Sequence, residues 1–546
     1  MKFLYALFIL LLIPFVAALE EYDEPRSGFS ADAEVRVVDT AVYQFGFVST
    51  DGEEWTQFSF TGITKEPWIL GEATADVSLY GVRYVAAYSC TWSDGWDCSS
   101  TWQVLDRGDQ SSSEESVDSM AGDLAALQAL YDSTNGDGWD SNDGWNGGEV
   151  NLSVHSPFGV TKEEIQGEWR VVEISLTENN LVGNLPSEIG GLDKLTYFNV
   201  KHNNLTGEIP ASIGNWKDIE ILYFAGRSAD DLNSNPNHQY HPGKSNHNAN
   251  VFSGEFPDVW ANFSKLREFQ LTGSTITRMF YESIGNCAEL RYIVAAFNEQ
   301  LEEELPASLS NLTKLQWLIL RSNSMQGELP DFSSMTDLRN IHLGNGNSFS
   351  GEINFSTNTK LRRINLDNND FSGDWPTYWN NGEFTNLVGI RATWNDFTGT
   401  LHGFENLTLH TFSMTGNNLV GSLPKSVTTN TGLIILSVGW NDMSGELPQN
   451  GWQEHTNTRY LRLNNNNFEG PIPDKLPTSS NLQFLRFQNN KLSGPISLDA
   501  TKYLNQSRYP VFNYMTIENN QFSEEDYQPL LDEMGSDKLR VGNQNS

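Results

Sequence analysis

The chain has 546 residues, of which 34 are Lys or Arg and 70 are Asp or Glu, so its formal net charge is −36. This acidity argues against nucleic-acid binding, because phosphates need a cationic surface. A hydrophobic share of 38% and an aromatic share of 12% exclude a disordered chain. Because 3 cysteines cannot staple a chain of this length, packing must stabilise the fold.

Residues 1–18 are typical of a secretory signal peptide. Lys2 precedes an apolar run, and the small residues Val16, Ala17 and Ala18 fit a cleavage site. The alternative is an uncleaved anchor, which would hold the protein at the cell surface. Pro14 and the short apolar run disfavour that alternative. We therefore expect a secreted protein with no membrane span after cleavage.

Residues 29–105 are rich in Val, Tyr, Phe, Trp and Thr with partial alternation, which predicts a small β-rich domain. A hairpin turning at residues 93–95 would place Cys90 opposite Cys98 and Trp92 opposite Trp96. In an exported protein this pairing favours a cross-strand disulfide between Cys90 and Cys98 over two free thiols. Residues 106–119 are acidic and Ser-rich, as in a linker.

A repeat with a spacing near 24 residues then runs through the chain, with the template LxxLxLxxNxLxGxIP. The two inward Leu residues belong to a short strand, and stacked turns would build a continuous parallel sheet. The Asn turns the chain out of the strand, and its amide can satisfy backbone groups of neighbouring turns. These marker residues are Asn179, Asn203, Asn250, Ser274, Asn298, Asn323, Asn347, Asn369, Asn395, Asn417, Asn441, Asn466, Asn490 and Asn520.

The template resembles that of plant-type extracellular leucine-rich-repeat proteins, such as receptor-like protein ectodomains and polygalacturonase-inhibiting proteins. The resemblance implies an α/β solenoid, a horseshoe or superhelix with a parallel β-sheet on its concave face. Residues 120–170, which include Trp169, resemble the N-terminal cap of such arrays. About 14 repeats would fill residues 171–525, and residues 526–546 read as a polar C-terminal tail.

Seven Asn-x-Ser/Thr sites fit an exported glycoprotein. They are Asn151, Asn204, Asn262, Asn311, Asn354, Asn406 and Asn505. An insertion at residues 225–249 interrupts the period, and the resemblance implies that such an island can shape a ligand site. It holds His238, Tyr240, His241 and His247, whose spacing matches no strong metal template. A solvated loop is the alternative interpretation of the island.

The sequence register also assigns residues to the outward positions of the concave strands. Arginines and aromatic rings there suit an acidic peptide or an anionic glycan, through bidentate pairing and stacking. The alternative is that these side chains only stack on adjacent turns. The predicted ligand-binding residues are Trp317, Arg321, Arg391, Trp394, Trp440, Tyr460, Arg462, Phe484 and Arg486.

No enzyme signature, phosphate loop or metal-spaced cysteine pair is found in the sequence, so we expect neither catalysis nor a cofactor. The leading hypothesis is a secreted recognition protein that binds a protein, peptide or cell-surface glycan through its concave face. Any signalling would then need a partner chain. Two alternatives stay open: a secreted enzyme whose chemistry lies in residues 29–105, and an extracellular matrix or ice-binding protein.

Overall fold

The computed structural model contains two compact units, Met1–Ser116 and Val117–Ser546. It describes residues 34–39, 44–49, 56–59, 75–79, 82–92, 96–106, 119–145, 152, 156–226, 249–497 and 511–544. The signal peptide, nearly all of the linker and most of the island lie outside these ranges. So do His238, Tyr240, His241 and His247 and the glycosylation sites Asn151 and Asn505.

In its described residues, the first unit contains two antiparallel sheets of three strands each. One consists of β1 (Glu34–Asp39), β2 (Gln44–Ser49) and β3 (Thr56–Ser59). The other consists of β4 (Ala75–Leu79), β5 (Val82–Trp92) and β6 (Trp96–Asp106). The register of β5 and β6 places Cys90 opposite Cys98 and Trp92 opposite Trp96, as expected from the hairpin. The disulfide itself stays a prediction.

The second unit begins with a cap that covers the first turn of the repeat array. It contains α2 (Met120–Ser133), the 3₁₀ turn η2 (Gly136–Gly138), β7 (Val160–Ile165) and β8 (Glu168–Ser175). Asp123 in α2 is fully buried and accepts a bond of 3.1 Å from Arg170 Nη2 and one of 2.7 Å from the Val171 amide. A buried carboxylate is tolerated only with such partners, so this contact fixes the helix on the first strand.

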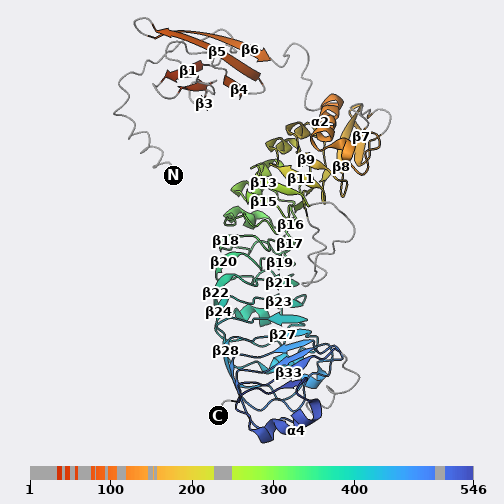
Figure 1. Ribbon diagram of the computed structural model, residues 1–546, viewed down its shortest axis with the longest axis vertical. Helices are drawn as coiled ribbons and strands as arrows, with labels where there is room; N and C mark the ends of the chain where they lie inside the picture. The colour runs from red at the N-terminus through yellow and green to blue at the C-terminus, as the bar shows by residue number, and fades with distance from the viewer. Residues whose placement is uncertain are drawn as a thin grey trace. The chain divides into compact units, whose positions relative to one another are not determined.

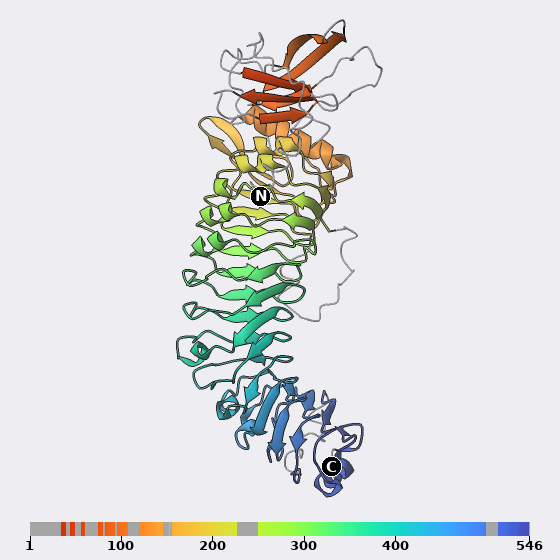
Figure 2. The ribbon, with the colours of Figure 1, turned by 90° about the vertical axis from the view of Figure 1, so that its left-hand side faces the viewer.

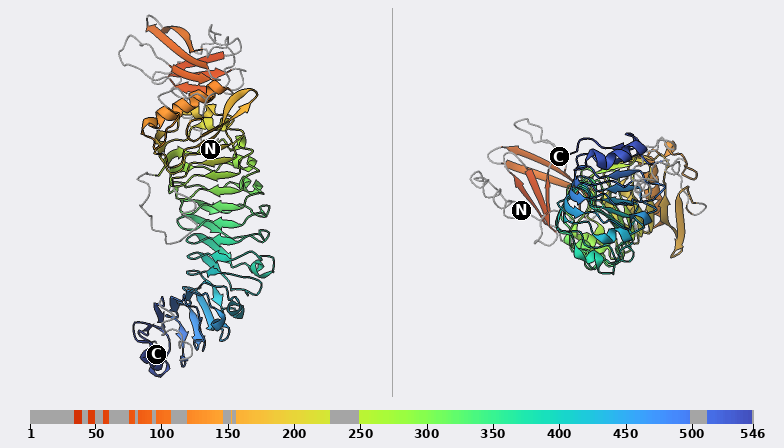
Figure 3. Two further views of the ribbon diagram at one scale, coloured as in Figure 1. Left: turned by 90° about the vertical axis from the view of Figure 1, so that its right-hand side faces the viewer. Right: turned by 90° about the horizontal axis from the view of Figure 1, so that it is seen from below.

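Sixteen strands form one long sheet along the solenoid, which we call the concave sheet (Figures 1 and 2). All its neighbours are parallel except β7 and β8, and successive strands rotate gradually down the stack (Figure 3). In β29, Leu461 is buried between the less buried Tyr460 and Arg462, so alternate side chains face outward. After β8 come β10 (Tyr197–Asn199), β12 (Ile221–Tyr223), β14 (Glu268–Gln270), β16 (Tyr292–Val294), β17 (Trp317–Ile319), β19 (Asn340–His342), β21 (Arg363–Asn365), β23 (Gly389–Arg391), β25 (Thr411–Ser413), β27 (Ile435–Ser437), β29 (Tyr460–Arg462), β31 (Phe484–Arg486), β33 (Tyr514–Thr516) and β34 (Leu539–Arg540).

Each turn leaves the concave sheet through a marker residue and most then add a short strand to one of three smaller sheets. These strands are β9 (Val182–Asn184), β11 (Asn204–Gly207), β13 (Val251–Glu255), β15 (Thr275–Arg278), β18 (Gln326–Glu328), β20 (Ser348–Gly351), β22 (Asp370–Asp374), β24 (Asp396–Thr398), β26 (Val420–Gly421), β28 (Asp442–Glu446), β30 (Asn467–Gly470) and β32 (Lys491–Leu492). Several return segments contain a 3₁₀ turn: η4 (Ser187–Gly191), η5 (Ala211–Asn215), η6 (Trp260–Asn262), η7 (Glu282–Asn286), η8 (Ala307–Asn311), η9 (Thr377–Asn380), η10 (Lys425–Thr429) and η11 (Trp452–Glu454).

The marker residues line up as a buried ladder, which confirms the predicted repeat. All fourteen are buried, with exposures between 0% (Asn203, Asn520) and 9% (Asn466). At Asn417, Oδ1 accepts from the Phe397 amide (3.1 Å), and Nδ2 donates to the carbonyls of Ala392 (2.9 Å) and Met414 (3.0 Å). One side chain thus satisfies backbone groups that would otherwise be buried without partners.

The C-terminal end differs from the polar tail predicted at residues 526–546. That segment contains most of α4 (Glu524–Met534) and all of β34, which pairs with β33 as the last strand of the concave sheet. Ser523 and Asp526 form a capping box at the start of α4, and Leu530 is fully buried. The physical reason is that a repeat array must cover the apolar side of its final turn. Among the described residues, no helix combines the length and apolarity needed to cross a bilayer.

The asparagine ladder is tested by replacing Asn417 with Ala. The variant leaves three buried backbone groups without partners, so we expect the free energy of unfolding to fall by about 3 kcal/mol. The control is Asn418→Ala, which changes the exposed neighbouring amide and should alter stability by less than about 0.5 kcal/mol. Denaturant titration measures both values, and equal effects of the two variants would contradict the role of the ladder.

The disulfide prediction is tested by counting reactive thiols. Cys287 is fully buried, its Sγ lies 3.1 Å from the Trp260 carbonyl, and burial raises the pKa of the thiol to about 12. A neutral, buried thiol does not react with a thiol reagent in the native protein. Because the chain has 3 cysteines, a Cys90–Cys98 bond leaves one reactive thiol in the denatured, unreduced protein. Three reactive thiols in that sample would show that the bond is absent.

Candidate ligand-binding site

Aromatic rings and arginines gather at the C-terminal end of the concave sheet. Five outward side chains of β29, β31 and β33 form what we call the C-terminal strip: Tyr460, Arg462, Phe484, Arg486 and Tyr514. The rings of Tyr460 and Phe484 stack with centroids 5.8 Å apart and planes 15° apart. Phe484 meets Tyr514 edge to face at 4.9 Å. The parallel register therefore turns single outward residues into a continuous aromatic surface.

The guanidinium groups of the strip lie on this aromatic surface. Arg462 is 4.7 Å from the ring centre of Tyr460, and Arg486 is 5.3 Å from that of Phe484. Arg486 also donates to the Tyr514 hydroxyl at 3.2 Å. Arg540 of β34 lies 3.8 Å from the Tyr514 ring and extends the strip. Sequence reasoning missed Arg540 because it assigned that segment to a tail, although its KLRV pattern repeats the strand template.

The two arginines of the strip face each other without a compensating acid. The register pairs Arg462 directly with Arg486 on the neighbouring strand. Within the described residues, neither has a carboxylate at salt-bridge distance, and the Nε of Arg462 is buried without a hydrogen-bond partner. Burial, and after it the charge of Arg486, lower the pKa of Arg462. Two like charges on adjacent strands are unfavourable until an anion is present.

The middle of the concave sheet has a different electrostatic arrangement. Arg391 is paired, because its Nε lies 2.7 Å from the carboxylate of Asp367, which is 1% exposed. Arg321 lies 4.9 Å from the Phe297 ring, and its Nε has no partner within the described part of the chain. Burial, together with the positive charges of Arg321 and Arg391, lowers the pKa of His342 to about 3. This imidazole is therefore neutral at neutral pH. Arg391 is therefore a paired side chain, whereas Arg321 has a buried Nε without a hydrogen-bond partner among the described residues.

Trp317 packs against neighbouring turns. It packs against a small hydrophobic cluster formed by Val294, Ala296 and Ile319, which are buried. Val294 and Ile319 belong to the neighbouring strands β16 and β17. Tyr292 lies beside Trp317, with the ring centroids 5.8 Å apart. For this residue, stacking within the fold accounts for the aromatic side chain without any ligand.

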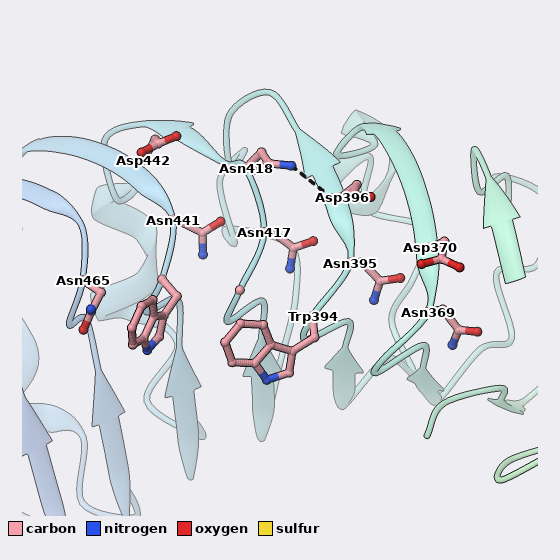
Figure 4. Close-up of a pocket in the computed structure, with 12 residues that line it drawn as sticks. Asn369, Asp370, Trp394, Asn395, Asp396, Asn417, Asn418, Asn441, Asp442 and Asn465 are labelled. Atoms are coloured by element: carbon pink, nitrogen blue, oxygen red, sulfur yellow. Dashed lines mark hydrogen bonds between the residues drawn. The ribbon is translucent and has the colours of Figure 1, made fainter. Parts of the chain in front are cut away.

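Trp394 and Trp440 occupy a place that differs from the predicted one. They were assigned to the concave face, but each lies past the end of its strand, in the turn before a marker Asn. Figure 4 shows this position for Trp394. The physical reason is that the chain leaves the sheet before the marker, and both residues occupy the left-handed position of that turn, with φ of 55° and 56°, as His202 and Phe297 do in other turns. The two tryptophans form the wall of a separate cleft at the rim of the solenoid.

The predicted glycosylation sites that the structure describes avoid the concave sheet. Asn262 and Asn311 end the return turns η6 and η8, and Asn354 and Asn406 are exposed on other return segments. Asn204 begins β11, one of the smaller-sheet strands. Glycans at these positions would leave the concave sheet open, although their presence stays a prediction. Across the described residues, no group of three or more His, Cys, Asp or Glu side chains is placed to hold a metal ion.

Comparisons with known proteins agree with this architecture. Residues 194–216 and 457–478 match the Leucine Rich Repeat family model. Receptor-like protein 39 of Arabidopsis thaliana is 26% identical over 164 residues, which cover 29% of this chain and 19% of that protein. Receptor-like protein 34 of the same plant is 28% identical over 195 residues, covering 32% and 20% of the two chains. The matches thus span about a fifth of the length of these relatives.

Solved structures show the same fold. The plant peptide hormone receptor RGFR1 in complex with RGF2 superposes with a TM-score of 0.53 at 24% identity, covering 64% of this chain and 52% of that one. The Arabidopsis receptor kinase HAESA, in complex with the peptide hormone IDA and the co-receptor SERK1, gives a TM-score of 0.54 at 22% identity. That match covers 78% of this chain and 74% of the chain in that structure. The predicted solenoid and the predicted resemblance are confirmed.

Proposed function

We propose that this leucine-rich-repeat solenoid is a secreted, non-catalytic recognition protein. Its ligand is an acidic peptide segment, free or within a partner protein, that lies in extended form along the concave sheet. The C-terminal strip provides the main contacts. Any signal across a membrane would pass through a partner chain.

The observation that carries this proposal is the unpaired arginine couple. Arg462 and Arg486 face each other on adjacent strands and have no acidic partner within the described residues. Holding two like charges side by side costs stability, and a bound carboxylate removes that cost. The guanidinium groups are half-buried on aromatic rings, so a carboxylate that reaches them is partly shielded from water and pairs more strongly.

The shape of the strip favours a peptide over a compact anion. Tyr460, Phe484 and Tyr514 lie one per turn, at the roughly 4.8 Å spacing of neighbouring strands. A chain crossing the strands would place successive groups over successive rings. The structural neighbours RGFR1 and HAESA are each bound to a peptide hormone, which supports a peptide rather than an anionic glycan.

Long-range electrostatics do not assist such a ligand. The chain carries a net charge of −36, so an acidic peptide is repelled at a distance and gains affinity only by direct contact with the arginines. This arrangement gives selectivity, because acidic molecules that cannot enter the strip are kept away.

The proposal predicts that acidic peptides lose affinity when the arginine couple is removed. Extended synthetic peptides, each made in a Glu form and a matched Gln form, are titrated calorimetrically into the secreted full-length protein. We expect the Glu forms to bind better, and Arg462→Ala plus Arg486→Ala to weaken them at least about tenfold.

The control for this double variant is Lys425→Ala plus Lys475→Ala. It removes the same net charge from two exposed side chains of return segments, Lys425 being part of η10, and should leave the affinity unchanged. Equal binding of the Glu and Gln forms, or equal losses in the two double variants, would contradict the proposal.

A further inference from the structure

An open cleft of about 500 Å³ lies at the rim of the solenoid, apart from the C-terminal strip (Figure 4). Its residues come from the turns that follow β21, β23, β25, β27 and β29, the last of which contributes Asn465. They lie at the buried marker asparagines and on both sides of them. Trp394, Gly416 and Trp440 precede their markers, while Asp370, Asp396, Asn418 and Asp442 follow theirs.

The two indoles of the cleft are exposed to an unusual degree. Trp394 is 52% and Trp440 is 53% exposed, more than any other large hydrophobic side chain of the described residues. Their ring centroids are 6.3 Å apart and the planes are tilted by 44°. Large aromatic surface left in water on a soluble protein points to a binding partner.

Both tryptophans occupy the left-handed position of their turn, with φ values of 55° and 56°. Other turns hold Glu178, His202, Phe297, Ser322, Asn465, Asn489 or Asn519 at this position, all with φ between 52° and 60°. The repeat therefore sets this backbone conformation whatever the side chain. What distinguishes the two tryptophans is their exposure, because indoles left in water gain nothing for packing and indicate a ligand.

Gly416 joins the two tryptophans into one surface. It occupies the equivalent place in the turn between them, with φ of 70°. A Cβ there would lie 2.3 Å from Cε3 of Trp394, so any side chain would displace the indole. The Trp394 ring therefore lies directly over the glycine backbone, and the two indoles form an aromatic platform across three successive turns.

A row of hydrogen-bond acceptors runs beside this platform. Asp370, Asp396 and Asp442 are exposed, and within the described part of the chain none of them forms a salt bridge. Asn418 completes the row and donates to Asp396 at 3.5 Å. The row supplies one acceptor or amide per turn, about 4.8 Å apart along the solenoid axis.

We propose that this rim cleft binds a neutral glycan chain. Pyranose rings stack their apolar faces on Trp394 and Trp440, and their hydroxyls donate to the three aspartates. An anionic glycan would be repelled by these carboxylates. A single cationic group is a poorer match, because the platform is open and the acceptors are spread over several turns instead of enclosing one point. The site is independent of the peptide site proposed for the C-terminal strip.

Calorimetry of the full-length protein with neutral hexasaccharides, cellohexaose and laminarihexaose, tests this proposal. We expect binding of at least one of them, with an affinity that is unchanged between about 0.05 and about 0.5 M salt. Trp394→Ala and Trp440→Ala should each weaken it at least about tenfold, and Trp440→Phe should weaken it less. Gly416→Val should also weaken it, because the new side chain displaces the Trp394 indole.

Phe158→Ala is the matched control, since Phe158 is an exposed aromatic residue (43%) of the N-terminal cap. Circular dichroism checks that each variant is folded, and peptide titrations on the same variants separate a failure here from a failure at the C-terminal strip. Absence of binding to both hexasaccharides, or unchanged binding in the Trp394 and Trp440 variants, would overturn the proposal. Salt-sensitive binding of oligo-lysine in their place would assign the cleft to a cationic partner and overturn it equally.

Discussion

The buried amide ladder is the constraint on which the whole second unit depends. Each turn must leave the concave sheet and bury its backbone against the next turn, where water cannot satisfy the peptide groups. At Asn203 and Asn441, as at Asn417, one amide donates to carbonyls of two turns and accepts from the amide of an adjacent turn. Ser274 takes this place once, and its hydroxyl accepts from the Phe252 amide at 3.2 Å. The ladder fixes the register, and the register decides which residues face outward.

Both proposed binding surfaces follow from this register. The outward strand positions before the marker carry the arginines and rings of the C-terminal strip. The positions on either side of the marker carry the tryptophans and aspartates of the rim cleft. Leu461 and Leu485 fill the core, while Arg462 and Arg486 on the same strands face outward. The outward residues can therefore differ between proteins of this fold without disturbing the core.

The repeat and the outward positions could be predicted from the sequence because a strict period states the register directly. The residues that contact these outward side chains could not be predicted. Asp367, which lies in the turn before that of Arg391, is buried and pairs with this arginine. The template does not predict that the side chain of Asp367 is buried. The template also does not state where each strand ends, and Trp394 and Trp440 lie past the strand ends, in the turn before the marker. The final strand, with Arg540, was missed because it lacks a marker Asn and follows a helix.

The central claim is that Arg462 and Arg486 recognise carboxylates, and a charge exchange tests it most directly. The affinity of Arg462→Glu plus Arg486→Glu is measured by calorimetry for one extended peptide made in a Glu form and a Lys form. If the two arginines recognise the charge of the ligand, the unaltered protein binds the Glu form more tightly and the double Glu variant binds the Lys form more tightly. The same preference in both proteins would contradict the account.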